Sequence, residues 1–184
     1  MAKVILGMTM SLDGFINDAS GSGVLLAPNL EELDRSDLMQ EAIGETGAVV
    51  MGRRTFEGAS DPDSYADSYE FQVPIFVITT HAPERKPKEN DRLHFTFVNT
   101  VEAAIRQAKQ AAGARDVVVV GGPNVGWQLL KASLVDELQI GIMPVLLGAG
   151  QQLFGHLEDR QILLKKTRLV EVGQCTYVYF TVQK

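Results

Sequence analysis

The chain has 184 residues, of which 45% are apolar and 22% charged, a composition typical of a globular domain with a sizeable core. Its formal net charge of −6 argues against a general nucleic-acid-binding or anionic-membrane surface. The single cysteine, Cys175, excludes an intramolecular disulfide framework, and no apolar run approaches the roughly 20 residues that span a bilayer. We therefore expect one cytoplasmic domain over residues 1–184.

Apolar runs rich in β-branched residues predict buried strands that alternate with helices through residue 130. The expected strands cover residues 4–8, 48–51, 75–78, 94–98 and 117–120. Apolar spacing predicts a helix over residues 30–42 and another over 101–112, the second capped by Asn99 and Glu102. The acidic stretch 61–70 is expected to be a surface loop.

Strands dominate the last third of the chain. Residues 138–143 predict a strand, and the alternation over residues 162–182 predicts an antiparallel pair joined near Gly173. Together, these elements predict an α/β fold with a mostly parallel sheet and antiparallel C-terminal strands.

Several common catalytic signatures are absent from the sequence. It contains neither a Walker-type phosphate loop nor a G-x-S-x-G nucleophile elbow, and no G-x-G-x-x-G follows the first strand. The three histidines are far apart in sequence and lack metal-ligand spacing, so we expect no metal site.

Two junctions between a strand and a helix have the chemistry of anion-binding sites. At the first, Gly52 permits close approach of a ligand, Thr55 and free backbone N–H groups can receive a phosphate, and Arg53 or Arg54 can add a forked contact. At the second, residues 121–124 (GGPN) let backbone N–H groups converge on a pyrophosphate. Each junction could instead be a plain structural turn, but the pair suggests a ligand with two separated phosphate groups.

The order of the motifs along the chain resembles the dihydrofolate reductase superfamily. The resemblance is strongest to the branch that contains the C-terminal reductase domain of the bifunctional riboflavin-biosynthesis deaminase/reductase. The matching segments are 10–16 (MSLDGFI), 49–57 (VVMGRRTFE), 77–80 (VITT), 119–123 (VVGGP), 136–140 (DELQI) and 144–150 (PVLLGAG). The resemblance implies a three-layer, dihydrofolate reductase-like fold and NADPH as the hydride donor.

The resemblance also implies roles for individual residues. Arg53 and Arg54 would meet the 2′-phosphate with help from Thr79 and Thr80, Thr55 would meet the pyrophosphate, and Met8 and Ile16 would line the nicotinamide pocket. The remaining implied cofactor residues are Gly52, Gly121, Gly122, Pro123, Asn124 and Val125, with a cis peptide between the two consecutive glycines. The implied substrate side consists of Asp37, Trp127, Pro144, Leu147, Gly148 and Gly150.

The chain departs from both branches of the superfamily at the substrate end. Folate reductases carry a carboxylate on the first helix that helps to protonate the pterin, and Asp37 or Asp34 could take that place here. Gly141 stands where those enzymes have a supporting threonine. Riboflavin-pathway reductases carry basic residues before the second strand, whereas residues 38–47 contain none.

The resemblance, together with the two anion-binding junctions, therefore implies an NADPH-dependent reductase that acts on a small pyrimidine- or pterin-like heterocycle, with Asp37 as the catalytic acid. One alternative is the 5-amino-6-(5-phosphoribosylamino)uracil reductase of riboflavin biosynthesis. Another is a non-catalytic NADP-binding module, and a third is a dimeric structural domain that has lost the cofactor. The exposed C-terminal strands are a candidate homodimer surface.

Overall fold

The computed structural model describes residues 2–27, 30–157 and 160–184. Its strands are β1 Val4–Ser11, β2 Thr46–Gly52, β3 Ile75–Ile78, β4 Phe95–Val98, β5 Asp116–Val120, β6 Glu137–Met143, β7 Leu164–Val172 and β8 Cys175–Val182. Its helices are η1 Val24–Leu26, α1 Leu30–Asp34, α2 Asp37–Glu45, α3 Arg53–Glu57, α4 Ser64–Ser68, α5 Val101–Ala112 and α6 Pro123–Lys131.

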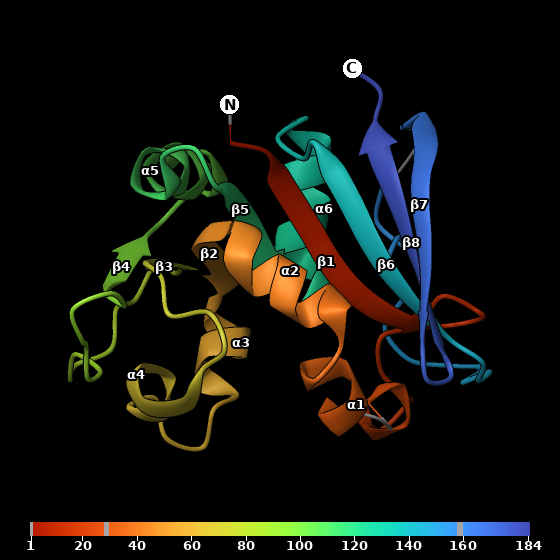
Figure 1. Cartoon of the computed structure of the whole chain (residues 1–184), viewed down its shortest axis with the longest axis horizontal. Helices are drawn as coiled ribbons and strands as arrows, with labels where there is room; N and C mark the ends of the chain where they lie inside the picture. Colours follow the sequence, from red (N-terminus) through yellow and green to blue (C-terminus); the bar gives the residue numbers. More distant parts are fainter. Residues whose placement is uncertain (1, 28–29, 158–159) are drawn as a thin grey trace.

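Within these residues, eight strands form one sheet in the order β4-β3-β2-β5-β1-β6-β8-β7 (Figure 1). The first six strands in that order are parallel, and β8 pairs antiparallel with both β6 and β7. The expected mostly parallel sheet with antiparallel C-terminal strands is confirmed. After β1 the chain turns toward β2, and after β5 it turns the other way, toward β6. Ligands of open α/β sheets bind at the carboxyl ends of two neighbouring strands whose connections run to opposite sides of the sheet.

Helices cover both faces of the sheet. Alternate side chains of β2 pack into the two cores that lie on these faces. Ala48 and Val50 belong to a core that includes the apolar residues of α5 and α6, whereas Val49 and Met51 belong to a second core with Phe56. The second core also receives apolar side chains of α2 and α4. Figure 1 shows α2 in front of the sheet and α6 behind it, which is the expected three-layer arrangement.

Three local expectations need correction. The helix expected over residues 30–42 is interrupted, because the Ser36 hydroxyl caps a new helix by accepting a hydrogen bond from the Met39 amide at 3.2 Å. The cap of α5 is Thr100 rather than Asn99, with the Ala103 amide 3.1 Å from its hydroxyl. The acidic stretch 61–70 is not only a surface loop, because it contains α4 and buries Tyr65 against Phe56 and Phe95.

The antiparallel end of the sheet leaves β7 as an edge strand. Its side chains are mainly exposed, among them Leu164 and Leu169. The homodimer expected at these strands stays a prediction. In the described part of the chain, no helix combines the length and apolar character needed to cross a bilayer.

Candidate active site

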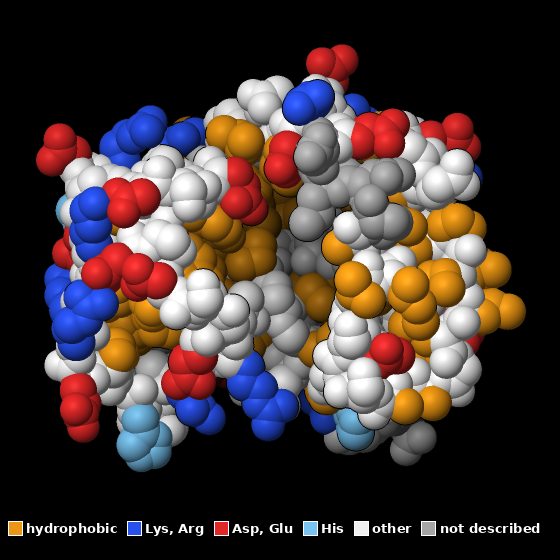
Figure 2. All heavy atoms as spheres, turned by 90° about the horizontal axis from the view of Figure 1, so that it is seen from below, with side chains coloured by type: hydrophobic (Ala, Val, Ile, Leu, Met, Phe, Trp, Pro, Cys, Tyr) orange, Lys and Arg blue, Asp and Glu red, His pale blue; other side chains and the backbone are white. Residues whose placement is uncertain are grey.

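Two neighbouring recesses open at the edge of the sheet where the parallel strands end. Seen from this edge, the molecule has a hollow with hydrophobic side chains in its depth (Figure 2). One recess, here called the α3–α6 groove, has a volume of about 350 Å³. It is lined by Gly52, Arg53, Arg54, Thr55, Ile78, Gly122, Pro123, Asn124, Val125, Gln128 and Gln151. The structure thus brings both predicted anion-binding junctions into one groove.

The contact between Gly121 and Thr55 joins the two junctions. Gly121 has φ +90°, and a Cβ at this position would lie 1.9 Å from Thr55 Oγ1. The Gly122 amide donates a hydrogen bond to the same hydroxyl over 3.2 Å. A Cβ at Gly122 would meet no atom within 4 Å, so this backbone is open toward the recesses. The peptide between the two glycines is trans, contrary to expectation, as are the other peptide bonds described.

The two arginines of the groove differ in their partners. Arg53 forms an ion pair with Glu57 one turn along α3, with an N–O distance of 3.1 Å. No described side chain forms an ion pair with Arg54, which is exposed at the same groove. Arg54 is therefore available to a ligand anion without the loss of an existing pair.

Thr79 and Thr80 follow β3 but do not line the groove. The Thr79 hydroxyl donates to the His81 carbonyl at 2.9 Å and accepts from the His81 amide at 3.0 Å. The Thr80 hydroxyl lies 2.8 Å from His81 Nδ1. Both hydroxyls are thus engaged in the turn itself, and their predicted contact with a 2′-phosphate stays a prediction.

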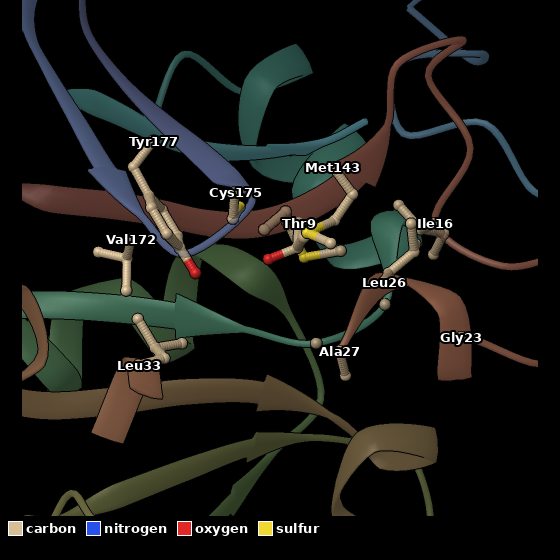
Figure 3. A pocket seen from close by; sticks show the side chains of 13 residues that line it. Thr9, Ile16, Gly23, Leu26, Ala27, Leu33, Met143, Val172, Cys175 and Tyr177 are labelled. Carbon is tan, nitrogen blue, oxygen red and sulfur yellow. The ribbon is translucent and has the colours of Figure 1, made fainter. Parts of the chain in front are cut away.

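The second recess, here called the central cavity, has a volume of about 370 Å³ and meets the groove at Gly122. Its lining is Met8, Thr9, Ile16, Gly23, Leu26, Ala27, Leu33, Gly121, Gly122, Met143, Val172, Cys175 and Tyr177 (Figure 3). Met8, Ile16 and the two glycines were predicted at a cofactor site. The other lining residues were not predicted at a site. Strand pairing brings in Thr9, Met143, Val172, Cys175 and Tyr177, and the segment around η1 and α1 contributes Gly23, Leu26, Ala27 and Leu33.

Three adjacent strands form the polar end of the central cavity. The sheet register aligns Thr9 of β1 with Gly141 of β6 and Tyr177 of β8. A Cβ at Gly141 would lie 3.0 Å from Thr9 Oγ1, from Cys175 Sγ and from a ring carbon of Tyr177. Glycine at this position therefore makes room for the three polar side chains to gather. The sequence signal was the alternation in β8, which places Cys175 and Tyr177 on one face of that strand.

Burial shifts the titration of two of these groups. It raises the pKa of the Tyr177 hydroxyl, and the neighbouring Cys175 raises this pKa further. A hydrogen-bonding interaction with Thr9 lowers it in part. Burial also raises the pKa of the Cys175 thiol. Both groups are consequently neutral at physiological pH, so the tyrosine hydroxyl can donate a hydrogen bond.

The predicted substrate-side loop, residues 144–150, is held by Asp13 and does not line the central cavity. The Asp13 carboxylate accepts from the Leu147 amide at 3.1 Å and the Gly148 amide at 2.8 Å. The Ser11 hydroxyl donates to the same carboxylate at 2.6 Å and is the main reason that the pKa of Asp13 is lowered. Leu147, Gly148 and Gly150 therefore belong to a loop–loop contact, and Leu147 also packs against Leu26, Met143 and Cys175. None of the three, nor Pro144, is in the cavity lining.

Two further substrate-side residues also lie outside the cavity lining. Trp127 is buried, and its indole N–H donates to the Leu153 carbonyl at 2.5 Å, so it is a core residue rather than a wall of the cavity. Asp37 is exposed in the first turn of α2, where a carboxylate complements the helix dipole. Asp34 is exposed at the end of α1. The structure therefore brings neither carboxylate into the cavity lining.

Comparison with known proteins shows the family. The model of the RibD C-terminal domain matches residues 2–178. This chain belongs to the RibD C-terminal domain family. The uncharacterized protein YwjB of Bacillus subtilis is 28% identical over 182 residues, covering 97% of each chain.

Two other relatives carry names from riboflavin biosynthesis. A crystal structure of a protein assigned to riboflavin biosynthesis in Shewanella sp. PV-4 has a TM-score of 0.77 at 25% identity, with complete coverage of both chains. The riboflavin biosynthesis protein RibD of Corynebacterium ammoniagenes is 28% identical over 158 residues, which cover 83% of this chain and 46% of that protein. Membership of the RibD C-terminal domain family accounts for the dihydrofolate reductase-like fold observed here.

The residues of the α3–α6 groove fit NADPH, the cofactor implied by the family resemblance. The open backbone at Gly122 and the amides that begin the nine-residue helix α6 suit a diphosphate. The two arginines supply positive charge for a further phosphate. The apolar cavity beyond Gly122 suits an uncharged ring. In the described residues, no group of histidine, cysteine or carboxylate side chains is arranged to hold a metal ion.

Proposed function

We propose that this protein is an NADPH-dependent reductase that reduces a small heterocycle bound in the central cavity. The observation that carries the proposal is the junction of the two recesses at Gly122. A phosphate-binding groove that leads into an apolar cavity provides both ends of a dinucleotide-dependent active site. The family, whose RibD relative functions in riboflavin biosynthesis, supports an oxidoreductase of the pyrimidine reductase type.

Within this proposal, the chain supplies binding and orientation. The nicotinamide supplies a hydride when it is bound. The helix α6 amides and Thr55 would hold the diphosphate, and Arg54 would hold the 2′-phosphate. Met8 and Ile16 would exclude water from one side of the ring site, because both line the cavity.

The contact between Asp13 and the 144–150 loop has a supporting role. Ile16 lies just beyond the turn that contains Asp13, and its amide donates to the Gln151 carbonyl at 2.9 Å. The Asp13 carboxylate holds the same segment at Leu147 and Gly148, shortly before Gln151. Together, these bonds fix the segment that brings Ile16 to the cavity.

The proton that must accompany the hydride has no carboxylate donor among the described lining residues. The hydroxyls of Thr9 and Tyr177, which line the cavity, could instead relay a proton from water, each taking up one proton as it gives another, so that both stay neutral. Asp37, the acid expected from the resemblance, has no role in this proposal.

A second candidate is the reductase of riboflavin biosynthesis that acts on 5-amino-6-(5-phosphoribosylamino)uracil. Membership of the RibD C-terminal domain family favours it. Complementation of a strain that lacks this reductase step separates the two candidates, since only the second restores growth without riboflavin.

The proposal is tested by following NADPH oxidation at 340 nm with a panel of oxidised pterins and aminopyrimidines. We expect at least one acceptor to be reduced, and we expect the reaction to weaken in Arg54→Ala at limiting NADPH. A protein that binds NADPH but reduces no acceptor would be a non-catalytic binding module. A protein that binds no NADPH would contradict the proposal altogether.

A further inference from the structure

We propose that the central cavity takes an uncharged planar ring without a phosphate group, and that the hydroxyls of Tyr177 and Thr9 recognise it. This inference rests on the proposed function, because it names the substrate class of the same site. It also separates this protein from a reductase that acts on a phosphoribosylated pyrimidine.

The two recesses differ in the charge of their lining residues. All 17 lysines and arginines of the chain fall within the described residues, and none of them lines the central cavity. The adjoining α3–α6 groove has two, Arg53 and Arg54. An ion that enters a low-dielectric site without a partner loses its hydration and gains little in return. The groove is therefore suited to phosphate and the cavity is not.

The segments next to the lining residues in sequence carry exposed apolar side chains. Their exposed side chains include Leu12, Val24, Leu25 and Leu146. Leu25 lies in η1 next to Leu26, which lines the cavity. These side chains offer a phosphate neither a charge nor a hydrogen bond. Arg35 is the basic residue nearest in sequence to the lining, two positions after Leu33, and it already has an interaction of its own.

The polar groups of the cavity lie together at one side of it. Figure 3 shows the hydroxyls of Tyr177 and Thr9 directed toward one another at one side of the cavity. Most of the remaining wall is apolar and includes Met8, Leu26 and Val172. A few polar groups in a mainly apolar pocket are the usual arrangement for orienting a neutral ligand. A ring carbonyl or ring nitrogen beside Tyr177 would receive a hydrogen bond, while the ring faces contact apolar side chains.

The volume of the cavity limits the size of the ring. At about 370 Å³, it is near the lower end of the range for ligand pockets. In the proposed reductase, this space also holds the nicotinamide. One or two fused rings are consequently the expected occupants.

The test compares two pairs of compounds, each pair differing only by phosphate: 6-hydroxymethylpterin with its phosphate ester, and uridine with uridine 5′-monophosphate. Calorimetry measures the binding of each to the free protein and to the protein saturated with NADP⁺, which prevents turnover. The variants are Tyr177→Phe and Thr9→Val, with Arg35→Ala as the control. Tm is measured in parallel for every variant.

We expect at least one uncharged compound to bind, and its phosphate ester to bind at least about 100-fold more weakly. Tyr177→Phe and Thr9→Val should each weaken binding of the uncharged compound by about 10-fold without a matching loss of Tm. Arg35→Ala should leave the preference for the uncharged member unchanged.

Equal or tighter binding of the phosphate esters would overturn the inference, as would unchanged affinity in both hydroxyl variants. Failure of both uncharged compounds to bind a protein that does bind NADPH would also overturn it. Selective binding of an uncharged ring without any NADPH binding would instead refute the proposed function and leave the cavity inference standing.

Discussion

Replacement of Gly121 by alanine tests the contact that joins the two junctions of the α3–α6 groove. The new Cβ would lie 1.9 Å from Oγ1, 2.4 Å from Cγ2 and 2.6 Å from Cβ of Thr55. Relief of such an overlap in a packed region costs about 1–3 kcal/mol. The backbone at φ +90° adds roughly 1–2 kcal/mol for a residue with a side chain. We therefore expect Gly121→Ala to lower the free energy of unfolding by about 2–5 kcal/mol.

Urea denaturation measures this loss through the fluorescence of Trp127, the only tryptophan of the sequence. With a denaturant slope of about 2 kcal/mol per molar urea, the midpoint should fall by roughly 1–2.5 M. The matched control is Gly122→Ala, because its Cβ would meet nothing within 4 Å. We expect the control to stay within about 0.5 kcal/mol of the unmodified protein.

A double-mutant cycle separates overlap from backbone strain. All three of the nearest atoms to the new Cβ belong to the Thr55 side chain. In a Thr55→Gly background, the cost of Gly121→Ala should therefore fall to the backbone contribution of about 1–2 kcal/mol. An unchanged urea midpoint for Gly121→Ala, or an unchanged cost in the Thr55→Gly background, would refute this reasoning.

Three other predictions concern the cofactor, the loop and the core. Arg54→Ala should weaken NADPH binding by about 10- to 100-fold and spare NADH, whereas Glu57→Gln should weaken neither; calorimetry measures both. Asp13 has a lowered pKa, so its stabilising bonds to the 144–150 loop are complete above about pH 4 and are lost as the pH falls further. Asp13→Asn should remove this dependence in hydrogen exchange of the loop. Trp127→Phe should lose about 1–3 kcal/mol of stability by circular dichroism, because the Leu153 carbonyl loses its donor.

Continuous apolar segments made the parallel strands predictable. Residues 117–120 are four valines, and the structure places them in β5 at the centre of the sheet. The segment 61–70 was less predictable because its acidic composition suggests a surface loop. Tyr65 is buried there because its ring packs on Phe56 and Phe95, and its hydroxyl donates to the Thr55 carbonyl at 3.3 Å. Only tertiary contacts show that this segment supports α3.

The same contrast holds for the candidate site. The α3–α6 groove was predictable because each of its junctions is a short continuous motif at a strand end. The polar end of the central cavity was not, since Thr9 and Tyr177 meet only through the pairing of β1 and β8 with β6. The motif at residues 144–150 was noticed, but its position depends on the Asp13 carboxylate, which the sequence did not identify as a partner.

Parallel calorimetric titration of the protein with NADPH and with NADH tests the central claim most directly. We expect micromolar binding of NADPH and much weaker binding of NADH, because the α3–α6 groove offers Arg54 to a 2′-phosphate. Absence of binding by either nucleotide up to millimolar concentration would contradict the account, and the groove would then be only a pair of structural turns.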